Sequence, residues 1–242
     1  MNPENLQSSE IAGFFPSFGG GGGRLVIFDL DGTLLDTIED LANSTNFALQ
    51  KHGFSTHSVD DYRFFVGNGI TRLIERALPE EARDETTVAL LMQDFMIYYL
   101  AHAEEYTHPY PGIEKLLADI HRAGIKIAVA SNKVQAATGQ LIENYFPDIP
   151  FAAVYGQRED MPIKPHPAVV NEIVKETGVT KSEVLYVGDS GVDVQTAVNA
   201  QVDLMAVLWG FRPKSELLEA GATRFAEKPD DIFQYLLQLT HF

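Results

Sequence analysis

Two aspartates separated by a single residue are the first candidates for chemistry in this chain. Asp29 and Asp31 stand at the C-terminal end of a short apolar run, Leu25–Leu30. In an extended segment alternate side chains share one face, so both carboxylates can project towards one substrate while Leu30 points into the core. One carboxylate can then act as a nucleophile while the other handles the proton of the leaving group. The alternative for this pair alone is two acids that solvate a strand end.

Three further polar motifs follow later in the chain. They are Ser131-Asn132, Lys164-Pro165-His166-Pro167 and Gly188–Asp193. Asp189 and Asp193 are four residues apart, which puts them on one side of a turn if a helix begins near Ser190. Each motif alone has a plainer interpretation: a strand-end hydroxyl, a surface lysine, and an N-capping aspartate followed by a solvent-facing one.

The negative charge of these residues shows that the site needs a cation. Carboxylates that face an anionic substrate repel it, and the formal net charge of −16 adds to the repulsion. A cation at about 4 Å contributes roughly 4 kcal/mol at an effective dielectric constant of about 20, whereas distant charges are screened. We therefore expect Mg²⁺, which prefers oxygen ligands, together with the fixed charge of Lys164. The Ser131 hydroxyl and backbone N–H groups near Gly32 and Asn132 can bind the oxygens of such an anion.

The elements that must position these residues alternate along the chain. Apolar runs typical of buried strands are Leu25–Leu30, Ile125–Ala130, Phe151–Tyr155, Val184–Gly188 and Leu204–Leu208. Amphipathic segments predict helices at Ile113–Ala123, Lys133–Tyr145, Ala168–Thr177 and Val192–Ala200. This alternation predicts an α/β fold with a doubly wound parallel sheet, whose ligand site lies at the carboxyl ends of the strands. The segment Trp209-Gly210-Phe211-Arg212 then either edges the cleft or forms a structural loop.

Residues 37–110 interrupt the alternation with helical patterns. Thr37 with Asp40 resembles a capping box, and a helical stripe from Ile38 to Leu49 follows it. Further helices are predicted near Val59–Phe65, Ile70–Leu78 and Glu80–Ala103, and the aromatic cluster Phe95, Tyr98 and Tyr99 is interpreted as a helix face in their common core. We expect a helical cap domain at 37–110, an α/β core at 24–36 and 111–242, and a flexible Gly-rich leader at 1–23.

The motifs, in this order and each beside the expected element, resemble those of the haloacid dehalogenase (HAD) superfamily of phosphohydrolases over about residues 24–242. The resemblance implies that Asp29 is the nucleophile of an aspartyl-phosphate mechanism and that Asp31 is the general acid and base. It implies phosphate binding by Gly32, Thr33, Ser131, Asn132 and Lys164. It also implies a Mg²⁺ site made by Asp29, the Asp31 backbone carbonyl and Asp189, with Asp193 as an outer support.

A narrower resemblance concerns the cap. Val66–Leu78 is similar to the cap segment of phosphoglycolate phosphatases, which makes 2-phosphoglycolate the expected substrate. Gly67, Asn68 and Gly69 would approach the substrate, and Arg72 would face its carboxylate; the alternative is a helix N-terminus with a solvated arginine. The other functions left open are a pyrophosphatase, a broad-specificity sugar or nucleotide phosphatase, and a binding protein that keeps the fold without turnover.

The composition limits the partners. With 18 Lys and Arg against 34 Asp and Glu, nucleic-acid binding is not expected, and the expected partner is a small phosphorylated metabolite. The chain has no Cys, which excludes disulfides and thiolate sites and fits a reducing cytoplasm. The N-terminus does not resemble a signal peptide, and Gln93 and Asp94 interrupt the longest apolar run, so no membrane contact is expected. The sequence predicts no particular oligomeric state.

Overall fold

The computed structural model describes residues 23–239, and all but the last residue of the predicted leader at 1–23 lies outside this range. The strands are β1 (Leu25–Phe28), β2 (Leu35–Asp36), β3 (His108–Pro109), β4 (Lys126–Val134), β5 (Ala153–Gln157), β6 (Val184–Gly188), β7 (Asp203–Val207) and β8 (Phe225–Ala226). The helices are α2 (Ile38–Lys51), α3 (Val59–Phe65), α4 (Gly69–Ala77), α5 (Glu85–His102), α6 (Ile113–Arg122), α7 (Gln135–Tyr145), α8 (Ala168–Thr177), α9 (Gly191–Ala200), α10 (Lys214–Glu219) and α11 (Pro229–Gln238), with short 3-10 turns at Glu80–Ala82 and Lys181–Glu183.

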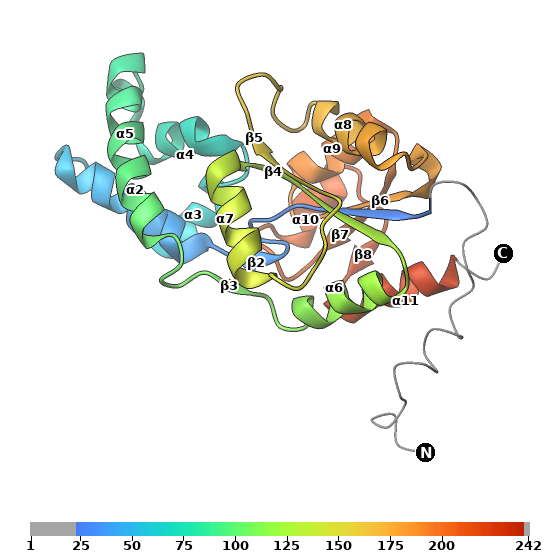
Figure 1. The fold of residues 1–242 in the computed structure, drawn as a ribbon. Coiled ribbons are helices and arrows are strands. Elements are labelled where there is room, and N and C mark those ends of the chain that lie inside the picture. The colour runs from blue at the N-terminus through green and yellow to red at the C-terminus, as the bar shows by residue number, and fades with distance from the viewer. Residues whose placement is uncertain (1–22, 240–242) are drawn as a thin grey trace.

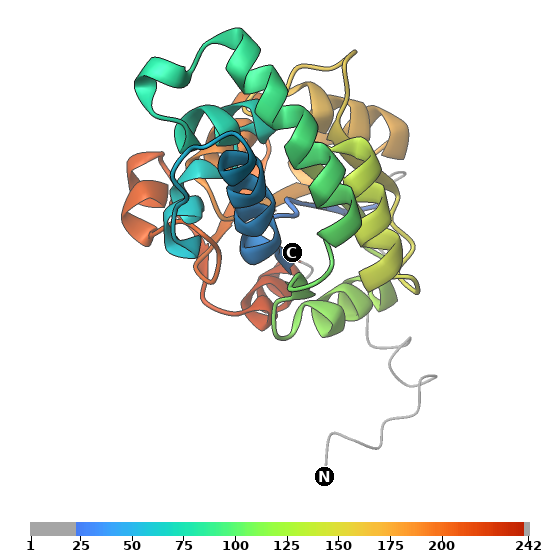
Figure 2. The ribbon, with the colours of Figure 1, turned by 90° about the vertical axis from the view of Figure 1, so that its left-hand side faces the viewer.

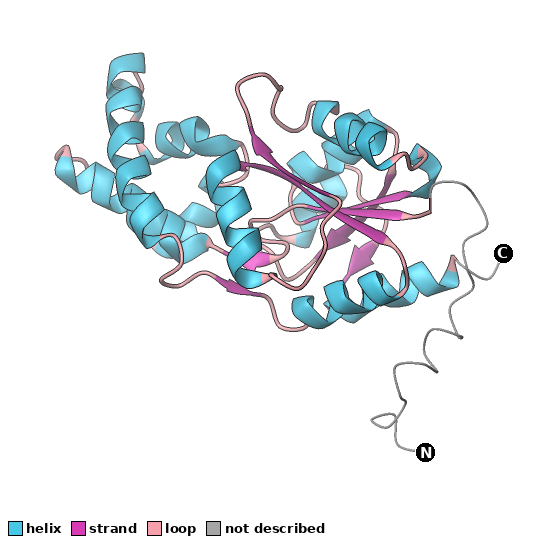
Figure 3. Ribbon diagram, viewed as in Figure 1, coloured by secondary structure: helices cyan, strands magenta, loops and turns pink. Residues whose placement is uncertain are grey.

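A parallel sheet forms the centre of the molecule. Within residues 23–239 it has six strands in the order β5-β4-β1-β6-β7-β8, and each neighbouring pair is parallel. Helices lie on both faces, with α6 and α11 on one side and α8 and α9 on the other (Figures 1 and 3). The predicted α/β fold with a doubly wound parallel sheet is confirmed.

The first strand explains why the sheet is covered on both faces. Its residues are all buried and alternate between two apolar clusters, Val26 and Phe28 packing on the side of α6 and α11, and Leu25 and Ile27 on the side of α8 and α9. A strand with two buried faces has no polar positions, which is why its sequence is a continuous apolar run. This strand ends at Phe28, so the following Asp29 lies at the edge of the sheet.

The inserted segment folds into a separate helical layer. Helices α2, α3, α4 and α5 share an apolar cluster of their own, in which Tyr62, Leu91 and Phe95 are fully buried. Figure 2 shows these helices in front of the sheet. The chain leaves the core through β2 and returns through β3, and these two short strands pair antiparallel, Leu35 with Pro109 and Asp36 with His108. The cap therefore joins the core through one two-stranded ribbon.

Two local predictions for the cap are wrong. The predicted helix at Glu80–Ala103 is divided, because Asp84 caps a new helix by accepting a hydrogen bond from the Thr87 backbone N–H at 3.0 Å. The capping box at Thr37 and Asp40 does not form. Instead, the Asp40 carboxylate accepts hydrogen bonds from the backbone N–H groups of Tyr106 and Thr107, at 2.8 to 3.2 Å, and so ties the two ends of the insert together.

The outer part of the core extends beyond the predicted elements. Strand β4 continues past Ala130 to Val134, and β8 with α11 adds a further strand and helix after the last predicted run. Ile232 and Leu236 are the residues of α11 that reach the core, and their four-residue spacing is the signal from which this helix could have been predicted.

Candidate active site

The strand ends bring four of the predicted residues together. β1 lies between β4 and β6, so Asp29, Ser131 and Asp189 come from three adjacent strands at the same edge of the sheet. Lys164, from the segment before α8, reaches Asp29 with its Nζ at 2.8 Å from Oδ1. This is the edge at which open α/β sheets bind their ligands.

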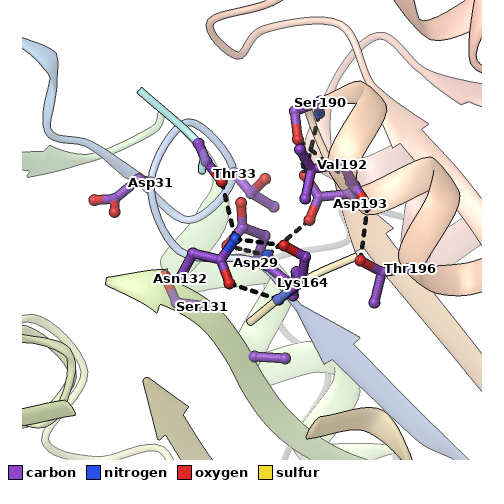
Figure 4. A network of polar contacts seen from close by, with 12 residues as sticks. Asp29, Asp31, Thr33, Ser131, Asn132, Lys164, Ser190, Val192, Asp193 and Thr196 are labelled. Atoms are coloured by element: carbon purple, nitrogen blue, oxygen red, sulfur yellow. Dashed lines mark hydrogen bonds and ion pairs between the residues drawn. The ribbon is translucent and has the colours of Figure 1, made fainter. Parts of the chain in front are cut away.

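Lys164 is the centre of a buried polar network (Figure 4). Its side chain is 3% exposed, and its ammonium also contacts Asp193 Oδ1 at 2.8 Å and the Tyr186 hydroxyl at 3.1 Å. The other Asp193 oxygen accepts hydrogen bonds from the Ser190 hydroxyl at 2.6 Å and the Ser190 N–H at 3.2 Å, which closes a capping box at the start of α9. Asp193 thus holds the lysine and begins the helix.

Three carboxylates crowd this network. Asp29, Asp189 and Asp193 are all buried, and each offers an oxygen within 4.8 Å of the others. Burial and the neighbouring Asp193 raise the pKa of Asp29 to about 7, although Lys164 opposes the shift. Burial, Asp193 and Asp29 likewise raise the pKa of Asp189 well above its ordinary value. Among the described residues the negative charge at this point therefore exceeds what Lys164 neutralises.

Close backbone packing fixes the Asp189 carboxylate. Oδ2 accepts a hydrogen bond from the Phe211 N–H at 2.7 Å, and the Thr33 hydroxyl lies 3.5 Å from Oδ1. A Cβ at Gly32, whose φ is +86°, would lie 2.4 Å from Asp189 Oδ2. A Cβ at Gly210 would meet the same side chain at 2.3 Å. Both positions accept only glycine, because the carboxylate occupies the space of a side chain.

Asp31 lies apart from this network, as Figure 4 shows. Its Oδ1 accepts hydrogen bonds from the Thr37 hydroxyl at 2.7 Å and from Lys133 Nζ at 2.8 Å. Thr37 is the residue predicted to cap α2, and its hydroxyl serves Asp31 instead. Burial lowers the pKa of Lys133, but the Asp31 carboxylate and Tyr99 raise it more, so the net pKa is above its ordinary value. Lys133 is therefore a charged ammonium.

Asn132 connects the core with the cap. Its side-chain amide donates to the Gly67 carbonyl at 3.0 Å and to the Lys164 carbonyl at 3.1 Å, and its Oδ1 accepts from the Lys164 N–H at 2.8 Å. The side chain is thus committed to positioning, which leaves the backbone for the predicted phosphate contact. The neighbouring Ser131 is buried and accepts a hydrogen bond from the Lys133 N–H at 3.2 Å.

A cavity separates the strand ends from the cap helices. Asp29, Asp31, Ser131, Asn132, Lys164 and Asp189 line its core side. The cap side is mostly apolar, formed by Leu41, Ile70, Leu73 and Met96. The predicted cap residues divide: Gly67 and Gly69 line the cavity with positive φ, whereas Asn68 binds Arg76 within the cap.

The structure does not bring Arg72 to the cavity, which corrects its predicted position. Its side chain is 65% exposed and forms an ion pair with Glu75 at 2.5 Å, on a surface that it shares with Arg76 and Arg83. Arg72 points outward because Leu73, Ile74 and Ala77 are the residues of α4 that face the interior. Arg72 is therefore a solvent-exposed arginine near the start of α4, as the alternative prediction had it.

Several residues of the site carry little sequence signal. Lys133, Tyr99 and Arg212 all line the cavity, and Tyr186 binds Lys164 beneath it. Tyr99 is buried and belongs to the cap core as predicted, but it also reaches the site. The segment Trp209–Arg212 lies at the cavity edge, where Phe211 and Arg212 line it. The sequence marks Tyr186 only by its hydroxyl, which is the one polar side-chain group in the run Val184–Gly188.

Comparisons with known proteins agree with this fold and site. Residues 26–207 match the family model described as haloacid dehalogenase-like hydrolase. The chain belongs to this family. The predictions of the HAD family and of a hydrolase are therefore confirmed.

Individual relatives of this HAD-like chain are similar over most of their length. A phosphoglycolate phosphatase of Cereibacter sphaeroides is 34% identical over 216 residues, covering 88% of this chain and 98% of the relative. Another phosphoglycolate phosphatase, from Mesorhizobium japonicum, is 34% identical over 189 residues, covering 77% of this chain and 83% of the relative. A crystal structure from Lactobacillus delbrueckii subsp. bulgaricus, provisionally assigned as a phosphoglycolate phosphatase, is 33% identical with a TM-score of 0.84, covering 89% of this chain and 98% of that one.

Among the helices of residues 23–239, none has the length and apolar character needed to cross a membrane. The cytoplasmic location and the absence of nucleic-acid and membrane partners stay predictions.

Proposed function

We propose that this HAD-family enzyme hydrolyses a small phosphate monoester, with 2-phosphoglycolate as the preferred substrate, through an aspartyl-phosphate formed on Asp29. The observation that carries the proposal is the buried Asp29 carboxylate at a strand end, 2.8 Å from Lys164 and open to a cavity shared with Asp31. A nucleophile beside a fixed cation, with a second carboxyl group on the leaving-group side, is what phosphoryl transfer to an enzyme needs.

The reaction divides into two displacements. An Asp29 carboxylate oxygen attacks phosphorus, the bond from phosphorus to the ester oxygen breaks, and that oxygen takes a proton from Asp31. Asp31 then accepts a proton from water, whose oxygen attacks phosphorus and breaks the bond to Asp29, which releases inorganic phosphate. The hydrogen bonds from Thr37 and Lys133 both fall on Oδ1 of Asp31, so in this mechanism its other carboxyl oxygen serves the ester oxygen.

The donor groups fit a divalent cation. The three buried carboxylates and the raised pKa values of Asp29 and Asp189 show a local excess of negative charge, and every donor is an oxygen, as Mg²⁺ prefers. Asp29, the Asp31 backbone carbonyl and Asp189 would hold the ion, whose charge would neutralise phosphoryl oxygens. Asp193 is less available, because both of its oxygens already accept hydrogen bonds from Lys164, Tyr186 and Ser190.

The leaving group must fit between the strand ends and the apolar cap residues Leu41, Ile70, Leu73 and Met96. The names of the relatives point to glycolate. A pyrophosphatase or a broad-specificity phosphatase would use the same Asp29, Asp31 and Lys164, so these functions differ only at the leaving group.

Phosphate release from a panel of esters tests the proposal. 2-Phosphoglycolate, pyrophosphate, a hexose phosphate and a nucleoside monophosphate are each assayed over a range of concentrations, with Mg²⁺ and after its removal by EDTA and dialysis. The highest kcat/KM is expected for 2-phosphoglycolate, and only with Mg²⁺. A higher value for another ester would replace the substrate, full activity without the metal would contradict the metal site, and no turnover of any ester would favour a binding protein.

A further inference from the structure

A carboxylated leaving group needs a cation that Lys164 cannot supply. Lys164 is engaged by Asp29 and Asp193 at the phosphoryl end of the site. In 2-phosphoglycolate a single methylene group separates the carboxylate from the ester oxygen, so the carboxylate lies close to the group that protonates this oxygen. Asp31 is that group in the proposed mechanism. The missing cation is therefore expected beside Asp31.

Lys133 is the cation at this place. Its side chain is 3% exposed, it lines the cavity, and its Nζ lies 2.8 Å from Asp31 Oδ1. An ammonium group has three N–H donors, and one hydrogen bond to Asp31 leaves donors for a second acceptor. When Asp31 carries its proton as the general acid, the Lys133 ammonium loses this counter-ion, and an anionic ligand is favoured because little solvent is present to screen the charge.

Tyr99 completes the same corner from the cap. Its ring is stacked on Phe95 and lies 4.9 Å from Lys133 Nζ, measured to the ring centroid. The residue is 1% exposed and lines the cavity, yet its hydroxyl has no hydrogen-bond partner of normal geometry among residues 23–239. The hydroxyl lies close enough to the Lys133 ammonium to raise the pKa of that lysine, so the two polar groups share one corner of the cavity and can face the same ligand.

The other cations near the cavity are already engaged. Arg212 donates to the Phe64 and Val66 carbonyls and forms an ion pair with Glu216 at 3.4 Å. Arg72 is exposed and outside the cavity. Lys133 is thus the cavity lysine whose only carboxylate partner among the described residues is Asp31.

We propose that Lys133 and Tyr99 form the subsite that binds the carboxylate of the leaving group. This inference rests on the proposed function, since it concerns the substrate preferred at the same site. Lys133 belongs to β4 of the core and Tyr99 to α5 of the cap, so the subsite exists only while the cap covers the core. Recognition of the carboxylate and closure of the cap are then one event.

The test compares 2-phosphoglycolate with its neutral amide, 2-phosphoglycolamide, which has nearly the same size. The measured quantity is the ratio of the two kcat/KM values with Mg²⁺ present. Lys133→Met should lower this ratio about 10- to 150-fold, the range for a hydrogen bond to a charged group. Tyr99→Phe removes the hydroxyl alone and should lower the ratio roughly 2- to 10-fold, with an unchanged or higher Tm. Arg72→Met is the matched control and should keep the wild-type ratio.

The outcomes separate the two proposals. A wild-type enzyme that prefers the acid, combined with an unchanged ratio in the folded Tyr99→Phe and Lys133→Met variants, would overturn the subsite and leave the proposed substrate intact. If Lys133→Met does not fold, Tyr99→Phe decides alone. A wild-type enzyme that treats acid and amide alike would overturn both the substrate and its carboxylate subsite.

Discussion

Lys164 joins two carboxylates that have different tasks. Asp29 faces the cavity, whereas Asp193 is fully buried and keeps its oxygens on Lys164, Tyr186 and Ser190. When Asp29 bonds to phosphorus its carboxylate charge is lost, and a buried ammonium left with no counter-ion at all would be strongly unfavourable. The pairing with Asp193 therefore keeps the ammonium in place while Asp29 forms and breaks its bond to phosphorus.

Replacing the nucleophile should stop turnover without unfolding the protein. Asp29→Asn keeps the shape of the side chain and removes the attacking oxygen anion, so a loss in kcat of at least roughly 10³-fold is expected for 2-phosphoglycolate. Asp60→Asn, at a side chain that is 91% exposed, is the control and should retain wild-type activity. Near-normal activity in a folded Asp29→Asn enzyme would refute the covalent mechanism.

The raised pKa of Asp29 predicts how a metal stabilises the protein at different pH. In the unfolded chain this carboxyl ionises near its ordinary value of 3.8, whereas in the folded protein it ionises at about 7. The unfolded state therefore binds fewer protons between these values, and the free energy of unfolding falls as the pH rises through this window. A divalent cation relieves the repulsion that appears when the group is ionised.

The increase in Tm caused by Mg²⁺ should accordingly be larger at pH 8 than at pH 5. Thermal unfolding is measured at both pH values with MgCl₂ and with NaCl of equal ionic strength as the control. A shift that is equal at both pH values, or no larger than the shift with NaCl, would contradict a cation site at these carboxylates.

The positions of residues at strand ends could be predicted from the sequence, whereas contacts between the cap and the core could not. Asp29, Ser131 and Asp189 follow apolar runs, so their common edge could be predicted from strand order in a parallel sheet. Lys133 and Tyr99 are 34 positions apart, and nothing local shows that they meet. Arg72 was misplaced because its role came from the resemblance, although the apolar residues Leu73, Ile74 and Ala77 already mark the buried face of this helix.

At the scale of elements, the cap is held to the core by hydrogen bonds to the carbonyls at the end of α3. Arg212, from the segment before α10, donates to the Val66 carbonyl at 2.9 Å and to the Phe64 carbonyl at 3.2 Å. The side-chain amide of Asn132, in β4, donates to the carbonyl of Gly67, just after the end of α3, at 3.0 Å. These bonds satisfy groups that a helix end leaves free, and they set the distance between cap and core.

Arg212→Ala should weaken closure of the cap for every substrate alike. A loss of about 10-fold in kcat/KM is expected on both 2-phosphoglycolate and its amide, so their ratio stays constant. Arg76→Ala is the matched control, because Arg76 binds the Phe65 carbonyl at 2.8 Å from within the cap. If Arg212→Ala changed the acid-to-amide ratio instead, Arg212 would be a carboxylate ligand rather than a contact between domains.

At the scale of the whole molecule, the cap and the core have separate apolar interiors. The cap cluster includes Leu91 and Phe95, and its contributions from the core are limited to Ala137 and Phe211 among the described residues. Most of the contacts that stabilise the cap are therefore internal to it. Proteins built in this way commonly depart from two-state unfolding.

Leu91→Ala should destabilise the cap selectively. Leu91 is fully buried, and truncation of such a leucine costs roughly 2–5 kcal/mol. Trp209, the single tryptophan, donates to the Thr33 carbonyl at 3.0 Å and so reports on the core. In urea, the helical circular dichroism of the variant should fall before its tryptophan fluorescence changes, while Ile127→Ala in the core should shift the fluorescence transition itself. Coincident transitions for Leu91→Ala would show one cooperative unit.

The ribbon formed by β2 and β3 gives the insert a common entrance and exit. Asp36 and His108 are paired neighbours, so the two ends of the core chain meet at this point whatever sequence lies between them. The segment is thus a cassette with one condition: an insert spliced at these two positions meets the same strand ends, but it must also supply the hydroxyl with which Thr37 holds Asp31.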